Sequence, residues 1–248
     1  MADIPNKQTN LLFDQRLLRF FTGIIAIALP ILTQLCSNCL LPSVSHSYHA
    51  GGRDIFVGLL FILSAFLMVY DGHKETMGKQ KGILGIILRF KQSILSKLAS
   101  IAAICVALSP VTPINTACET GISLDANSII HYVSAVFLFC VLSYFCLGPF
   151  TQSAAQKKAQ IRVGIYRICG YLMLGGIACL FANGLFQFLK IDFLAPYRIA
   201  FWAEALMLWA FGFAWFTASQ ILFAQHNRNF NPLEEILNEK LYNEQQKS

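Results

Sequence analysis

The chain has 248 residues, of which 56% are hydrophobic and only 13% charged, with a formal net charge of +6 and a mean hydropathy of +0.55. Soluble domains usually contain about 25% charged residues, so this composition excludes a water-soluble fold. A basic chain often binds nucleic acid, but here the cations flank apolar segments. Anionic membrane lipids are therefore the expected partners, and no nucleic-acid partner is predicted.

Six continuously apolar segments follow a polar N-terminal arm at 1–16, which lacks the pattern of a cleavable signal peptide. These segments cover residues 17–41, 55–70, 93–108, 128–150, 164–189 and 199–224. A hydrocarbon core of about 30 Å needs about 20 helical residues, so the second and third segments need their flanks to cross it. The segments lack period-two alternation, which favours helices over a barrel. The sequence therefore predicts an all-α fold: a polytopic six-helix transmembrane bundle at 17–224, followed by a tail at 225–248.

The lysines and arginines are distributed unevenly between the gaps that separate these segments. Of the 19 cationic residues, 16 lie in the N-terminal arm, in the second and fourth gaps, in the tail or at the adjoining ends of the apolar segments. The other three are Arg53, Lys190 and Arg198. Cytoplasmic loops carry the excess of such residues, so both termini are predicted to be cytoplasmic in a bacterial inner membrane. The basic stretch 82–97 is either an interfacial amphipathic helix or the inner end of the third span with snorkelling cations.

Polar residues at the predicted outer ends of the spans are the candidates for a ligand-binding site. They are His49, Arg53, Asp54, His131 and Glu204, with Asn183 and Gln187 at similar depth. Glu204 has only apolar neighbours on its own helix, and an isolated carboxylate in lipid usually faces the bundle interior and pairs. Its expected partners are Arg53, His131, Arg198 or a bound cation. Glu204 locks helices together through such a pair, contacts a ligand or acts in catalysis, or is simply exposed near the outer interface.

Three histidines, His46, His49 and His131, are the candidate metal ligands. Imidazole and carboxylate groups suit Zn²⁺, although the chain has no His-Glu-x-x-His motif. The alternative is that the loop histidines are solvated or form hydrogen bonds. Asp54 has an alternative role too, because a carboxylate at the start of a span stabilises a helix N-terminus.

Eight cysteines are present, and most of them lie within the apolar segments, where cysteine acts as a small hydrophobic residue. Cys36 and Cys39 form a Cys-x-x-Cys motif at the outer end of the first segment, and Cys118 lies in the second outer loop. A thiol–disulfide relay uses such a motif, but it ordinarily needs a second cysteine pair facing it. The oxidation states of these three cysteines are left open.

Six motifs occur in order along the chain: His49-Ala-Gly-Gly-Arg-Asp-Ile-Phe-Val-Gly58, Tyr70-Asp-Gly72, Lys97-Leu-Ala-Ser-Ile-Ala-Ala-Ile-Cys-Val-Ala-Leu-Ser-Pro110, Ile130-His-Tyr132, Arg167-Ile-Cys-Gly170 and Phe201-Trp-Ala-Glu-Ala205. This series resembles a family of bacterial six-span membrane proteins related to the FRAG/DRAM/SFK group. The resemblance covers 17–223 and implies no particular activity. It implies that the candidate site residues fall within the family's motifs. The zinc hydrolases of the alkaline ceramidase type are a poorer match, because the paired His-x-x-x-His on a late span is absent.

Three functions are compatible with these features. The first is binding of a lipid head group or small polar ligand in an outward-facing polar pocket. The second is a metal-dependent membrane hydrolase that acts on lipid at the outer face, with Glu204 or Asp54 as general base and zinc as its cofactor. The third is a transporter, which the apolar middle of each span disfavours.

Overall fold

The structure is a computed structural model that describes residues 7–70, 83–113, 116, 118, 119, 121, 123–191 and 196–221. Its elements are α1 (Lys7–Leu35), the 3₁₀ helix η1 (Val44–Tyr48), α2 (Arg53–Val69), α3 (Ile83–Leu108), α4 (Ala126–Phe145), the π-helical turn η3 (Cys146–Phe150), α5 (Thr151–Gln156), α6 (Gln160–Phe188) and α7 (Ile199–Ser219). The described ranges contain helices and no strand, which confirms the all-α class predicted from the sequence.

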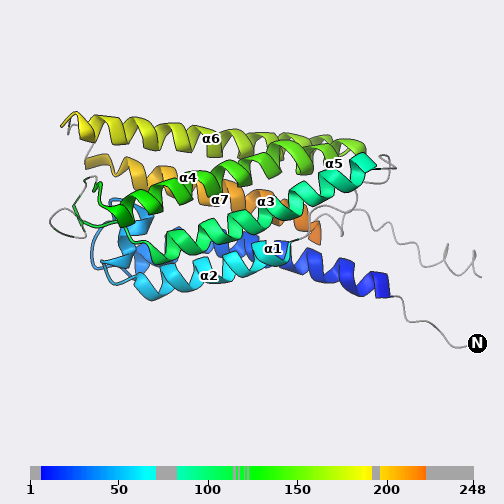
Figure 1. The fold of residues 1–248 in the computed structure, drawn as a ribbon, viewed down its shortest axis with the longest axis horizontal. Coiled ribbons are helices and arrows are strands. Elements are labelled where there is room, and N and C mark those ends of the chain that lie inside the picture. The colour runs from blue at the N-terminus through cyan, green and yellow to red at the C-terminus, as the bar shows by residue number, and fades with distance from the viewer. Residues whose placement is uncertain are drawn as a thin grey trace, which may run out of the picture.

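The six long helices run along the long axis of the molecule (Figure 1). Their mutual contacts form a closed ring. Each long helix packs against the next one in the chain, from α1 through α4 and then α6 to α7. The ring closes because α7 packs extensively on α1. The first and last helices are therefore neighbours, and residues from both ends of the sequence share one core.

Four helical stretches are long and apolar enough to cross a membrane: Arg16–Leu35, Ala126–Gln156, Gln160–Phe188 and Ile199–Ser219. The chain is therefore an integral membrane protein by the length and composition of its helices. The stretch Gln92–Leu108 in α3 is apolar but shorter, and α2 has 17 residues. Membrane crossing by α2 and α3 stays a prediction.

The fourth predicted span continues past its expected end at Phe150. Its α-helical part stops at Phe145, the π-helical turn η3 follows, and α5 carries the helix on to Gln156. Pro149 within the turn has no N–H to donate, which interrupts the regular ladder of hydrogen bonds. The Thr151 hydroxyl donates to the Cys146 carbonyl at 2.7 Å and satisfies part of the interrupted backbone. The proline thus changes the helical pitch without ending the helix.

A cluster of aromatic rings fills the bundle near the C-terminal end of α7. Trp215 is fully buried, and its ring lies 4.9 Å from Tyr70 and 5.8 Å from Phe150, measured between centroids. The Arg19 guanidinium lies 5.5 Å from the centre of the Tyr70 ring and donates to the Ala218 carbonyl at 3.2 Å. These contacts join α1, α2 and α7 at this end of the ring.

Close backbone approach between α1 and α7 depends on two glycines. A Cβ atom added at Gly23 would lie 2.7 Å from the Gly212 carbonyl oxygen, and one added at Gly212 would lie 2.7 Å from the Gly23 oxygen. Both obstacles are helix backbone, which cannot swing aside. Small residues permit this kind of approach between membrane helices. The same interface gains a hydrogen bond from Trp209 Nε1 to the Ile27 carbonyl at 3.2 Å.

We predict that Gly23→Ala destabilises the bundle by about 1–3 kcal/mol, because the new methyl group forces α1 away from α7. Thermal unfolding of the detergent-purified protein measures this loss. Gly58→Ala in α2 is the matched control, because a Cβ atom at Gly58 meets nothing within 4 Å. The control should be neutral or slightly stabilising. Equal unfolding temperatures for the two variants would contradict the close contact between α1 and α7.

Candidate functional site

The loop between α1 and α2 folds over one end of the ring and is held by a side chain of α1. The amide nitrogen of Gln34 donates to the Cys39 carbonyl at 3.0 Å, and its amide oxygen accepts from the Leu41 N–H at 3.0 Å. The Asn38 N–H donates to the Ala50 carbonyl at 3.0 Å, which closes the loop on itself. These bonds satisfy polar backbone groups that follow the end of α1.

A disulfide between Cys39 and Cys118 links this loop to the loop between α3 and α4, with the two Cα atoms 6.0 Å apart. The other cysteine of the Cys-x-x-Cys motif, Cys36, is a free and exposed thiol. The two cysteines of the motif are therefore not bonded to each other. The covalent link holds two of the loops at this end of the bundle together.

The Glu204 carboxylate on α7 accepts hydrogen bonds from this loop. Ser43 Oγ donates to the carboxylate and lies 3.0 Å and 2.9 Å from its two oxygens, and the Val44 N–H donates to Oε2 at 2.7 Å. The sequence predicted that Glu204 pairs with Arg53, His131 or Arg198. Within the described part of the chain, its hydrogen-bond partners are Ser43 and Val44 instead. Arg198 instead donates to the Cys118 carbonyl at 2.8 Å. Loop hydrogen bonds, rather than an arginine, connect this carboxylate to another part of the bundle.

His131 on α4 is buried and bonded to the end of α3. Its Nδ1 lies 2.9 Å from the Ser109 carbonyl oxygen and 3.1 Å from that of Val106. The last carbonyls of a helix lack partners within that helix, and a carbonyl only accepts, so Nδ1 carries the hydrogen. In the neutral ring the other nitrogen, Nε2, is then an acceptor.

Glu204 and His131 line one cavity of about 520 Å³ at this end of the bundle. This volume is in the range typical of ligand pockets. The polar residues that line it are Ser43, Ser45, His46, His131, Tyr132, Asn183, Gln187 and Glu204. Farther along the helices the lining is apolar and includes Leu60, Phe139 and Met207. The cavity is thus polar near the loops and apolar toward the middle of the bundle.

Three of the predicted site residues lie outside this lining. His49 Nε2 lies 3.0 Å from the Val111 carbonyl oxygen. Arg53 lies with its guanidinium carbon 4.7 Å from the centre of the Tyr48 ring, an arrangement typical of a cation–π contact. Asp54 is exposed in the first turn of α2, where a carboxylate favours the helix dipole. The structure therefore groups His131 and Glu204 in the cavity and places His49, Arg53 and Asp54 outside it.

The cavity also contains groups that the sequence did not single out. Ser43 and the Val44 N–H were not among the expected partners of Glu204, and Tyr132 was not a candidate. A serine or a main-chain N–H carries no distinctive pattern in a sequence, so only the folded loop reveals this role. Asn183 and Gln187 were noticed because amides are uncommon in apolar spans, and both line the cavity.

The proposed metal ligands are divided between the cavity and its surroundings. His46 and His131 line the cavity, whereas His49 bonds to the Val111 carbonyl. Within the described part of the chain, no group of three or more His, Cys, Asp or Glu side chains is arranged to hold a metal ion. These described residues therefore provide no set of ligands for the zinc ion of the alternative hydrolase function.

His46 is a buried neutral histidine whose side chain has an unsatisfied nitrogen. Only 5% of the residue is exposed, and its Nδ1 has no hydrogen-bond partner. The pKa of His46 is lowered from 6.5 to about 4, mainly by burial. The neighbouring His49, His131 and Arg198 contribute smaller parts of this decrease, in that order of importance. At neutral pH, His46 thus adds no positive charge to the cavity.

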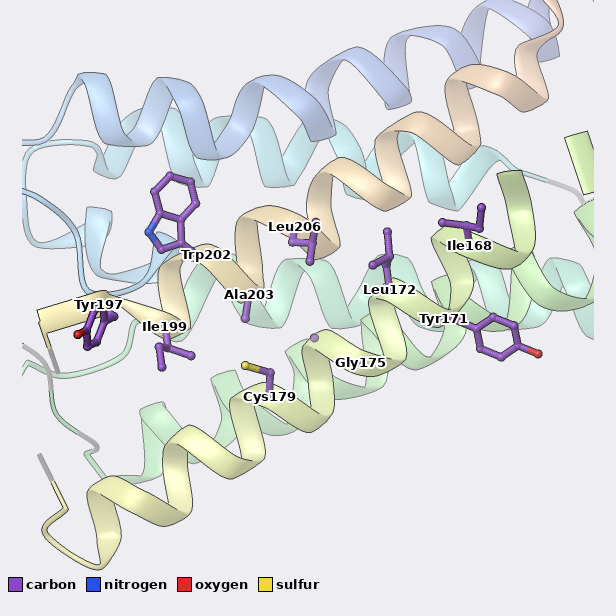
Figure 2. A pocket seen from close by; sticks show the side chains of 11 residues that line it. Ile168, Tyr171, Leu172, Gly175, Cys179, Tyr197, Ile199, Trp202, Ala203 and Leu206 are labelled. Carbon is purple, nitrogen blue, oxygen red and sulfur yellow. The ribbon is translucent and has the colours of Figure 1, made fainter. Parts of the chain in front are cut away.

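A second hollow of about 580 Å³ lies between α6 and α7 on the outer surface of the ring. Figure 2 shows its lining residues, which include Leu172 and Cys179 on α6 and Trp202 and Leu206 on α7. No charged or amide side chain lines it among the described residues. Its polar groups are limited to tyrosine hydroxyls, the Trp202 indole N–H and the Cys179 thiol, so the cavity that contains Glu204 is the better candidate site.

Comparison of the chain with protein-family models, curated proteins and solved structures gives no match. The resemblance to the FRAG/DRAM/SFK group stays a prediction. The functional argument consequently depends on the geometry of the cavity.

We predict that acidification from pH 6.5 to pH 4 destabilises the protein partly through His46. In this range the unfolded histidine binds a proton and the folded one does not, so the contribution of His46 is complete above pH 6.5 and decreases as the pH falls. The resulting decrease in the free energy of unfolding amounts to about 3 kcal/mol at most. Unfolding of wild type and His46→Asn across this range measures it. His49→Asn should reduce the acid sensitivity only slightly, because burial contributes more to the low pKa of His46 than the His49 charge does. An equally steep loss of stability in His46→Asn as in wild type would refute this assignment.

Proposed function

We propose that this integral membrane protein binds a lipid head group or small polar ligand in the cavity lined by Glu204, His46 and His131. We further propose that it is a six-span protein of a bacterial inner membrane, with both termini cytoplasmic and the cavity toward the outer face. The observation that carries the binding proposal is the cavity itself. Its polar groups gather at the loop end, and its apolar walls extend into the bundle.

Two independent features support the orientation. The first is the distribution of cationic residues, 16 on one side against three on the other. The second is the disulfide between Cys39 and Cys118, since disulfides persist in oxidising compartments outside the cytoplasm. Both features support an orientation in which the cavity end of the bundle is at the outer face.

The shape and lining of the cavity support an elongated amphiphilic ligand. Lining residues on α6 extend from Ile177 to Phe188, which corresponds to about 16 Å along the helix. Apolar side chains at the deep end suit a hydrocarbon chain, and the groups around Glu204 suit a polar head. A few polar groups in a mainly apolar pocket are the usual arrangement for orienting a ligand.

We predict that Ala135→Trp on α4 abolishes copurification of an amphiphile with the protein. Ala135 lines the cavity, so the indole occupies the space that the ligand needs. Native mass spectrometry of the detergent-purified protein measures the bound amphiphile. Wild type should carry about one molecule per chain and Ala135→Trp should carry none.

Val133→Trp is the matched control, because Val133 lies on the same helix and is 64% exposed. This variant introduces the same side chain on the outer surface and should keep the bound molecule. Equal occupancy in the two tryptophan variants would place the ligand elsewhere and would refute the cavity as the binding site.

We predict that a membrane-impermeant maleimide labels Cys36 in intact bacterial cells, because this exposed thiol lies at the cavity end of the bundle. The matched control is Gln160→Cys combined with Cys36→Ser. Gln160 is exposed at the start of α6, at the opposite end of the ring. That variant should react only after the cells are permeabilised. The reverse pattern would show that the proposed orientation is inverted.

A further inference from the structure

The charge of the cavity is set by Glu204. No lysine or arginine lines the cavity among the described residues. In the two loops at this end, the structure does not describe positions 114, 115, 117, 120, 122 and 192–195. None of these positions is a lysine or arginine in the sequence. The neighbouring Arg198 is bonded to the Cys118 carbonyl, and His46 is neutral at pH 7. A carboxylate in this cavity thus lacks a cationic partner within the described chain.

The hydrogen bonds around Glu204 are those that suit an ionised carboxylate. The Val44 N–H can only donate, and it lies 2.7 Å from Oε2. Ser43 Oγ accepts from the Ser45 N–H at 3.2 Å and lies 2.6 Å from Ser45 Oγ. When Ser45 donates its hydroxyl hydrogen to Ser43, Ser43 donates its own to Glu204. This chain of donors stabilises negative charge on Glu204.

Hydrogen bonds from neutral donors offset only part of the cost of a carboxylate within a membrane protein. Such carboxylates usually pair with a positive charge. Ser43 and Val44 are neutral, so a cation that enters the cavity would add the stabilisation that these donors do not supply. An anionic ligand would add repulsion to a site that already holds a negative charge.

Other groups that line the cavity can accept hydrogen bonds. The amide oxygen of Gln187 and Nδ1 of His46 have no partner, and Nε2 of His131 is an acceptor in the neutral ring. A protonated primary amine offers three N–H donors with a positive charge. A quaternary ammonium offers the charge without donors, and an alcohol offers one donor without charge.

We infer that the cavity selects an amphiphile whose polar end is a protonated primary amine, bound by Glu204, with its hydrocarbon chain between Leu60, Phe139 and Met207. This inference rests on the proposed binding function and names the chemical class of the ligand. The amine is supplied either by the head group of an aminophospholipid or by a free amine.

The test compares three probes that share one hydrocarbon chain and differ in head-group charge: dodecylamine, dodecanol and dodecanoate. Binding to the full-length protein is measured at pH 7 by native mass spectrometry. Dodecylamine should bind about tenfold more tightly than dodecanol, as expected for one charge-assisted hydrogen bond, and dodecanoate should bind most weakly. In Glu204→Gln the amine and the alcohol should bind within about twofold of each other. An unfolding temperature of this variant close to that of wild type shows that the bundle remains folded.

Failure of the inference differs from failure of the proposed function. If the three probes bind equally well and Ala135→Trp abolishes their binding, the cavity binds amphiphiles and the preference for an amine is refuted. If no probe binds wild type, both the proposed function and the inference are refuted. If Glu204→Gln does not fold, the relative affinities of the three probes for wild type still test the preference for an amine.

Competition against bound dodecylamine distinguishes the source of the amine. Displacement by phosphatidylethanolamine but not by free ethanolamine supports a lipid head group, and displacement by ethanolamine alone supports a soluble amine. Phosphatidylglycerol has no amine. If it displaced dodecylamine as effectively as phosphatidylethanolamine does, the inference would be overturned.

Discussion

The contact between the Glu204 carboxylate and the loop residues Ser43 and Val44 determines how the cavity end of the bundle is built. A carboxylate on a membrane helix needs hydrogen-bond donors, and the loop supplies a hydroxyl and a main-chain N–H. The Phe201 N–H donates in return to the Pro42 carbonyl at 3.0 Å. These bonds hold the first loop against the last helix. They place Ser45 and His46 in the cavity wall, which they line together with Glu204.

The two ends of the ring differ in how they are filled. At the far end, Trp215, Tyr70 and Phe150 pack ring against ring and occupy the interior. At the loop end, the side chains leave a cavity of about 520 Å³ with polar groups on its walls. Tight packing at one end and an opening at the other suit a molecule that admits a ligand from one side. Polar residues gather where loops supply hydrogen bonds, because unpaired polar groups are costly deep in the membrane.

Part of the candidate site was predictable because a polar residue in an apolar span is conspicuous. Glu204 and His131 were found in this way, and both line the cavity. Arg53 and Asp54 were predicted from their position in the outer loop. Position in a loop does not determine the direction of a side chain: Arg53 lies over the Tyr48 ring, and Asp54 lies in the first turn of α2. Ser43 was missed because serine is common in loops and indicates nothing by itself.

The sequence by itself determined the all-α class, the presence of membrane-spanning helices and the approximate bounds of α2, α6 and α7. These properties depend on local hydropathy, which each short stretch of sequence defines by itself. The predicted bounds of two helices were wrong: α1 ends at Leu35 rather than at residue 41, and α3 begins at Ile83 rather than at residue 93. The tertiary structure decided which residues meet: Glu204 with Ser43, 161 positions apart, and Cys39 with Cys118, 79 positions apart. It also decided that α7 closes the ring on α1 through Gly23 and Gly212. Such pairings depend on how the helices pack, and a pattern in one segment does not specify its partner.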